Sequence, residues 1–154
     1  MNLMINEIYV FIMSMLPIAE LRGAIPLGIA LGVPWQRVAM ISIIGNLIVV
    51  PIVLGCVEWL FHHLRKLEVL RKHIENYESR AANKIAHYRE YRLLGLFILV
   101  AIPLPGTGAY TGCVAARVMN IRFRNAWGVI SAGVVTAGCI MTLVARGVIH
   151  LNIL

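Results

Sequence analysis

Two runs of 20 residues without a charged side chain, at 38–57 and 126–145, dominate this sequence. A transmembrane helix needs about 20 predominantly apolar residues. Each run begins close to a tryptophan, Trp35 or Trp127, and tryptophan concentrates at the headgroup interface of a bilayer. Both runs are therefore predicted to cross a membrane as helices.

Two further apolar regions are interrupted. Residues 8–19 are uncharged over 12 positions, and a helix of that length, roughly 18 Å, is too short to cross about 30 Å of hydrocarbon. The chain then runs through Pro17-Ile-Ala-Glu20-Leu-Arg22-Gly23-Ala-Ile-Pro26. Residues 93–116 contain Pro103-Leu-Pro105-Gly106-Thr-Gly108, which does not continue a regular helix. Each region is predicted to form a half-helix, a break and a second half-helix.

The composition excludes a water-soluble globule, a disordered tail and a nucleic-acid-binding module. Hydrophobic residues make up 60% of the chain and charged residues 14%, against about a quarter charged in soluble domains. The net charge of +7 is therefore interpreted through the positive-inside rule. No nucleic-acid partner is expected.

The basic residues favour two re-entrant hairpins over four kinked full spans. Polar backbone groups at a helix break cannot face lipid, so a break must lie within protein or beside a watery cavity. With re-entrant hairpins, eleven basic residues fall on the side of segment 62–92 and two on the other side; four full spans give nine against four, and Arg22 is set aside in both cases. The larger asymmetry places segment 62–92 in the cytoplasm. Four kinked spans remain the alternative.

The predicted fold is an all-α integral membrane protein built from two inverted repeats. Each repeat is a re-entrant helical hairpin plus one transmembrane helix, at 1–61 and 93–154. Paired interrupted segments in two halves indicate a transport site near the bilayer midplane. The connector at 62–92 is predicted to be a cytoplasmic amphipathic helix, which extends the first span, lies on the lipid surface or pairs with a second copy. Because two full spans leave little room for a pathway, we expect a homodimer.

Glu20 and Arg22 are the strongest candidates for chemistry. A charge in the hydrocarbon region costs at least ~2.5–3.5 kcal/mol on insertion scales, so such residues face an interior or a cavity. Opposite charges two residues apart can partly neutralise each other, and they can bind a proton, an ion or a charged headgroup. A buried carboxylate is a natural proton carrier because burial disfavours its charged form. The alternative is that both charges only support the hairpin tip.

The second broken region supplies further candidates. Arg117 either reaches the cytoplasmic interface or lines the cavity opposite Glu20. Amides after Pro105 and nearby hydroxyls can hold an anionic group, because half-helix N-termini attract anions, and Asn46 can hydrogen-bond within the membrane. The predicted substrate and proton site comprises Glu20, Arg22, Pro26, Asn46, Pro103, Pro105, Gly106, Thr107, Tyr110, Thr111 and Arg117.

No pattern in the sequence indicates an enzyme, a metal site or a cofactor. The five histidines form no spaced ligand set, and the three cysteines stand alone in apolar stretches, so a zinc site is not expected. A nucleophile–base pattern, a P-loop and a dinucleotide fingerprint are all missing from the sequence. We therefore expect no catalytic residues, no bound metal and no cofactor.

The chain resembles the small multidrug export proteins. The resemblance rests on Glu20-Leu-Arg22-Gly23-Ala-Ile-Pro26-Leu-Gly and Pro103-Leu-Pro105-Gly106-Thr-Gly108-Ala-Tyr110-Thr-Gly112, and it covers essentially the whole chain. That family resembles a distant branch of the DedA/VTT membrane proteins, which implies two re-entrant hairpins and either proton-dependent transport or movement of lipid carriers such as undecaprenyl phosphate. Glu20 matches the acidic residue of the first DedA hairpin by position. The second motif departs, because Thr107 and Gly108 stand where an arginine is expected and Arg117 is a loose substitute.

The sequence thus predicts a membrane transporter that exports a small molecule with proton coupling through a midplane site. The alternatives are a DedA-like lipid translocase or scramblase and a non-transporting membrane assembly factor. The expected partners are the lipid bilayer, protons, a small-molecule or lipid substrate and a second copy of the chain. The expected location is the plasma membrane of a prokaryote.

Overall fold

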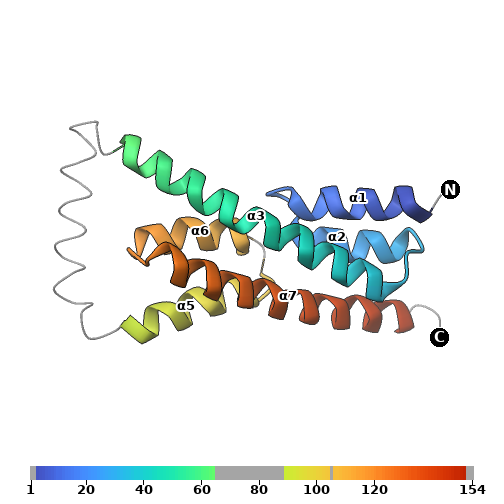
Figure 1. Cartoon of the computed structure of the whole chain (residues 1–154). Helices are drawn as coiled ribbons and strands as arrows, with labels where there is room; N and C mark the ends of the chain where they lie inside the picture. Colours follow the sequence, from blue (N-terminus) through green and yellow to red (C-terminus); the bar gives the residue numbers. More distant parts are fainter. Residues whose placement is uncertain (1–2, 65–88, 105, 152–154) are drawn as a thin grey trace.

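The computed structural model describes residues 3–64, 89–104 and 106–151, and all regular secondary structure within these ranges is helical (Figure 1). Most of the predicted amphipathic connector at 62–92 lies outside the described residues. The helices are α1 (Leu3–Met15), α2 (Glu20–Ala30), α3 (Trp35–Leu64), α5 (Arg89–Ala101), α6 (Ala109–Val118) and α7 (Phe123–Leu151).

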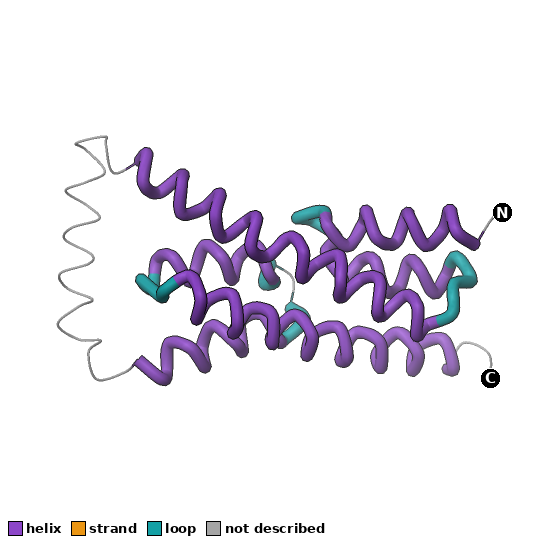
Figure 2. The backbone as a smooth tube through the Cα atoms, viewed as in Figure 1, coloured by secondary structure: helices purple, strands orange, loops and turns teal. Residues whose placement is uncertain are grey.

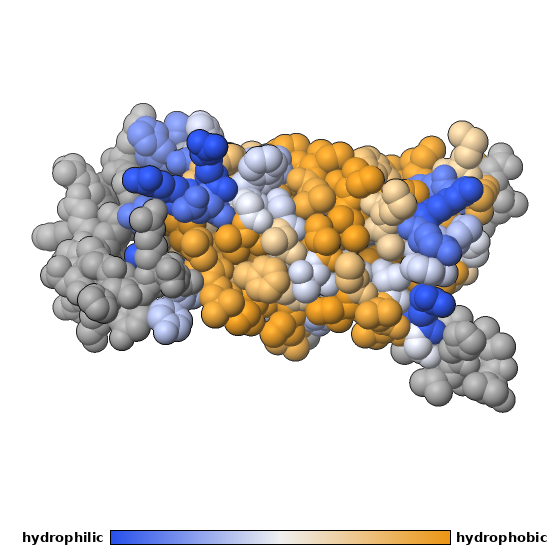
Figure 3. Space-filling model, turned by 60° about the horizontal axis from the view of Figure 1, so that its bottom comes forward, coloured by the Kyte–Doolittle hydropathy of each residue, from blue (hydrophilic) through white to orange (hydrophobic). Residues whose placement is uncertain are grey.

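Two of these helices, α3 and α7, are long and apolar enough to cross a membrane. The qualifying segments are Trp35–His63 and Phe123–Gly147, which contain the two uncharged runs predicted to span. Figure 3 shows why this surface suits lipid: a broad band of hydrophobic side chains lies between hydrophilic ends. At one of these ends, the Arg146 guanidinium lies 4.3 Å from the centroid of the Trp35 ring, a cation–π contact suited to a headgroup interface.

The two interrupted regions form helical hairpins. Helix α1 ends at Met15 and α2 runs back beside it; α5 ends at Ala101 and α6 runs back beside it. The two hairpins occupy opposite ends of the bundle, and their loops meet near the middle of α3 and α7 (Figure 2). The predicted order of half-helix, break and half-helix is present in both regions.

Helices α3 and α7 pack against each other, and both hairpins pack against both long helices. Within each half, the first hairpin helix approaches the following long helix closely at a glycine. A Cβ atom at Gly45 of α3 would lie 3.3 Å from the Phe11 carbonyl oxygen of α1, and one at Gly133 of α7 would lie 3.3 Å from the Phe97 carbonyl oxygen of α5. Both halves therefore use the same close packing.

The second helices of the two hairpins, α2 and α6, are called the return helices below. Their C-terminal ends have the same backbone geometry. Gly32 has a φ of 78° and Asn120 a φ of 53°, the left-handed conformation that commonly closes a helix. The next residue donates its amide to a carbonyl five positions earlier, at 3.1 Å from Val33 and 2.9 Å from Ile121. This hydrogen bond defines a Schellman motif. It turns the chain sharply into the long helix that follows.

Candidate functional site

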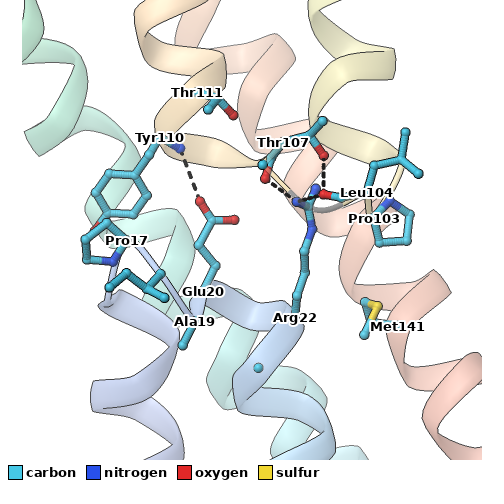
Figure 4. A pocket seen from close by; sticks show the side chains of 13 residues that line it. Pro17, Ala19, Glu20, Arg22, Pro103, Leu104, Thr107, Tyr110, Thr111 and Met141 are labelled. Carbon is cyan, nitrogen blue, oxygen red and sulfur yellow. Dashed lines mark hydrogen bonds between the residues drawn. The ribbon is translucent and has the colours of Figure 1, made fainter.

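The loops of the two hairpins enclose a cavity of 540 Å³. Its polar lining comes from the start of α2 and from the loop and first turn around the start of α6 (Figure 4). Helix α7 contributes Met141. The lining residues are Pro17, Ile18, Ala19, Glu20, Arg22, Gly23, Pro103, Leu104, Gly106, Thr107, Tyr110, Thr111 and Met141.

Glu20 is buried at the start of α2, with 6% of its surface exposed. Its Oε1 accepts a hydrogen bond from the backbone N–H of Tyr110 at 3.3 Å. In Figure 4 the other carboxylate oxygen points into the space between Glu20 and Arg22. Tyr110 lies in the first turn of α6, where unpaired backbone N–H groups give the helix a partial positive charge. The carboxylate is therefore held by the end of a helix in the other hairpin.

Arg22 binds the other arm of the same hairpin loop, at the end of α5. Its guanidinium donates to the carbonyl oxygens of Val100 at 3.3 Å, Ile102 at 3.1 Å and Leu104 at 2.8 Å, and also to the carbonyl of Thr107. These carbonyls belong to the last turn of α5 and to the loop that follows. A cation is favourable at this end, where helix carbonyls lack intrahelical partners. Arg22 thus gives the carbonyl groups at the helix break a charged hydrogen-bond donor.

Glu20 and Arg22 attract each other electrostatically, but no direct salt bridge joins them in the described part of the chain. Among the described residues the salt bridge is Arg37–Glu7, at 3.1 Å, and no ion pair joins Glu20 to Arg22. Residues two positions apart on a helix do not face each other. Each charge therefore finds a separate partner in the second hairpin, the carboxylate at the start of α6 and the guanidinium at the end of α5.

The Tyr110 hydroxyl adds a further connection between the hairpins, whereas the Thr107 hydroxyl bonds within its own loop. The Tyr110 hydroxyl donates to the Met15 carbonyl at the end of α1, at 2.5 Å. The Thr107 hydroxyl donates to the carbonyls of Ile102 and Leu104 at 3.0 and 2.9 Å. As a result, each hairpin supplies donors to the C-terminal carbonyls of the other hairpin's first helix.

The cavity reaches the apolar outer surface of the bundle. Ile18 and Leu104 line it from opposite loops and are 99% and 54% exposed. The two hairpin loops lie near the middle of α3 and α7 (Figure 2). The site therefore combines a polar interior with an apolar rim.

A sequence model described as "Putative small multi-drug export protein" matches residues 20–140. The chain belongs to this family. No curated protein and no solved structure matches the chain significantly. The family description assigns the chain to membrane export of small molecules. In this member of the small multidrug export family, the matched region begins at Glu20. It therefore contains the cavity-lining residues Arg22 and Tyr110 and the turns that carry them.

The structure brings most of the predicted site residues of this export protein together. Those lining the cavity are Glu20, Arg22, Pro103, Gly106, Thr107, Tyr110 and Thr111. Pro105 lies outside the described residues. Pro26 is exposed on α2, Asn46 is buried within α3, and neither lines the cavity.

Arg117 lies at the far end of α6 and does not line the cavity. Its guanidinium lies 6.0 Å from the Phe61 ring centroid, and its Nη1 donates to Asn120 Oδ1 at 3.5 Å. Of the two interpretations of Arg117 that the sequence allowed, the structure therefore excludes the one in which it lines the cavity. The cavity of this family member therefore draws its cationic group from Arg22.

Two contributors to the site of this export protein were not predicted as site residues. Met141 is an ordinary apolar residue in a spanning helix, and only the packing of α7 against α2 brings it to the cavity. Gly108 belongs to the motif that predicts the second helix break, but its contact with Glu20 depends on how the two loops pack together. A Cβ atom at Gly108 would overlap the Glu20 carboxylate.

Proposed function

We propose that this protein is a proton-coupled exporter that moves a small molecule through the cavity between the two hairpin loops. The observation that carries the proposal is Glu20, a buried carboxylate that lines a cavity and is held by a backbone N–H from the other hairpin. A carboxylate in such a place can take up and release a proton while changing its attraction for that helix end. Because the chain belongs to an export family, we take transport to be the process that this protonation drives.

The hairpins are proposed to be re-entrant and the two halves to be inverted repeats. Three corresponding pairs support the repeat, Glu20 with Gly108, Gly32 with Asn120 and Gly45 with Gly133, because the members of each pair are 88 residues apart. Each pair also occupies corresponding places, at the start of a return helix, at its end and in the following long helix. Interrupted segments that meet between repeats are the typical setting of a midplane transport site.

Protonation of Glu20 is proposed to loosen the contact between the hairpins. The ionised carboxylate is attracted to the start of α6, and the neutral acid is attracted less. Arg22 keeps its carbonyl partners on the α5 side in both states. The hairpins therefore separate first at the α6 side, which opens the cavity next to Glu20. A substrate that carries a positive or hydrogen-bonding group then replaces the helix end as the partner of Glu20.

The apolar rim favours an amphiphilic substrate. Ile18 and Leu104 flank the mouth at a depth where lipid surrounds the bundle. A molecule with an apolar body can approach through the bilayer while its polar group enters the cavity. The same opening favours a second candidate function, passive movement of a lipid headgroup through the cavity with its acyl chains outside.

We further place the protein in the plasma membrane of a prokaryote, as a homodimer with segment 62–92 in the cytoplasm. The basic residues on the side of that segment support this orientation. The small number of spanning helices supports the dimer, because a second copy can provide the outer wall that a single chain lacks. Blue native electrophoresis and chemical cross-linking in the native membrane test the dimer.

The test uses purified full-length protein in liposomes that contain ethidium as an amphiphilic cation and pyranine as a pH indicator. With an imposed pH gradient, ethidium movement and a matching change in pyranine fluorescence are expected. Protein-free liposomes and liposomes without a gradient are the controls. Movement of fluorescent phospholipid without ethidium or proton flux would replace export by lipid translocation. If all three signals stay at background, a non-transport role follows.

A further inference from the structure

A second cavity, of 200 Å³, lies at the other end of the second hairpin from the loop site. It is formed between the first turns of α5 and the turn that joins α6 to α7. Two guanidinium groups and two amides line it, from Arg92, Arg122, Asn120 and Asn125. None of the lining residues in the described part of the chain is acidic. The export site does not account for this polar pocket.

The backbone of the turn gives the pocket its shape. Arg92 Nη1 donates to the Met119 carbonyl at 2.9 Å, which ties α5 to the end of α6. Asn120 then adopts a left-handed conformation with φ 53°. The chain reverses there and presents Arg122 and Asn125, both exposed, on the other wall.

The pocket lies at the depth of lipid headgroups. Phe123 and Trp127 follow it directly on α7 and are 40% and 49% exposed, as expected for an aromatic belt. Arg146, the partner of Trp35 at the other end of the bundle, lies 19 positions after Trp127. That separation is roughly 28 Å along a helix, close to the thickness of the hydrocarbon core. The pocket thus lies just outside the apolar band. The exposed apolar side of α7, beginning at Phe123 and Trp127, extends from it toward the middle of the bundle.

We propose that this pocket binds the phosphate of an anionic phospholipid headgroup, with the acyl chains lying along α7 beside Trp127. Guanidinium groups match phosphate oxygens in a two-pronged geometry, and basic pockets between helices at a membrane surface suit such headgroups. The Asn125 amide supplies a neutral donor, and Arg122 supplies the exposed cation. This site does not depend on the proposed export function.

The test measures phosphatidylglycerol retained by the full-length protein in nanodiscs of equal phosphatidylglycerol and phosphatidylcholine, by native mass spectrometry. The matched pair is Arg122→Gln and Arg124→Gln, because both remove one exposed surface charge and Arg124 does not line the pocket. We expect Arg122→Gln to lower phosphatidylglycerol retention about ten-fold more than Arg124→Gln. Asn125→Ala, which changes no charge, is also expected to lower it.

Equal losses in Arg122→Gln and Arg124→Gln, with no effect of Asn125→Ala, would overturn the proposal, because only general surface attraction would remain. Equal retention of phosphatidylcholine would do the same. Inorganic phosphate is added as a competitor, and it should displace the lipid poorly because it gains nothing from the apolar flank. Displacement as effective as that by added phosphatidylglycerol would identify a free-phosphate site instead. Unchanged thermal melting of the variants excludes misfolding as the cause.

Discussion

The Glu20 carboxylate occupies the space that a Cβ atom of Gly108 would need. The two residues start the return helices of the two hairpins, Glu20 as the first residue of α2 and Gly108 as the N-cap of α6. A charged side chain of one loop thus fits against the other loop only because that position carries no side chain. The contact joins segments 88 residues apart in the sequence.

Replacing Gly108 with alanine is expected to damage the site more than any other glycine substitution in the loop. Gly108 has φ 141° and ψ −165°, a conformation essentially confined to glycine that costs about 1–3 kcal/mol for other residues. The added methyl group would also displace the Glu20 carboxylate. Gly106→Ala is the matched control, because Gly106 has φ 81° and open space around it. Thermal melting and liposome export of both variants measure the difference; equal effects would reduce the role of Gly108 to backbone strain.

Glu20→Gln is expected to yield a folded, inserted protein that has lost pH-driven export. Glutamine keeps the size and the hydrogen bond to the Tyr110 N–H but cannot ionise. Glu20→Asp keeps an ionisable carboxyl group and should retain part of the activity with an altered pH profile. The readout is ethidium and proton flux in liposomes at a series of pH values. Normal export by Glu20→Gln at every pH would leave Glu20 with a structural role and end the proton-coupled proposal.

Arg22→Lys is expected to destabilise the protein although it keeps the positive charge. A lysine ammonium cannot reproduce the planar fork of donors that reaches the carbonyls of Val100, Ile102 and Leu104. Losing hydrogen bonds from a charged donor costs about 1.5–3 kcal/mol, even though the Thr107 hydroxyl still donates to Ile102 and Leu104. Arg146→Lys, at the end of the bundle, is the control and should have little effect. Thermal melting in detergent compares the two, and equal melting temperatures would contradict the role assigned to Arg22.

Linking the two loops should stop export if the hairpins must separate. In a background without the native cysteines, Ile18→Cys and Leu104→Cys place one thiol on each loop at the mouth of the cavity. A flexible, cleavable bifunctional maleimide is expected to abolish export, and cleavage of the linker is expected to restore it. Each single-cysteine variant treated with the same reagent is the control. Full export by the cross-linked protein would exclude hairpin separation as a transport step.

Cysteine labelling should report both hairpins as re-entrant. Cysteines at positions 75 and 120 are expected to react only from the cytoplasmic side, and one at position 152 only from outside. For the first hairpin, cysteines at Met4 and Gln36 should share the outer side, because α1 begins and α3 begins at the same end of the bundle (Figure 1). An impermeant maleimide applied to intact cells and to inverted vesicles makes the measurement. Opposite sides for positions 75 and 120 would require a full span through the second hairpin.

The sequence alone determined the long helices, the helix breaks and the two charged groups of the site. Uncharged runs specify the two long helices because burial in lipid depends on local hydropathy. Proline and glycine specify the breaks at 17–19 and 103–108 because they act on their own backbone and immediate neighbours. The cost of a charge within the membrane singled out Glu20 and Arg22 without any knowledge of their partners.

Only the tertiary structure decided which groups meet. The sequence placed Glu20 beside Arg22, but their side chains leave α2 in different directions. Glu20 binds the start of α6, and Arg22 binds the end of α5 and the loop that follows. The sequence left open whether Arg117 lines the cavity, and the length of α6 carries it away to Phe61. Hydropathy and helix breaks are properties of a few neighbouring residues. The partner of a buried charge depends on how segments more than 80 residues apart pack together, and no local pattern encodes that packing.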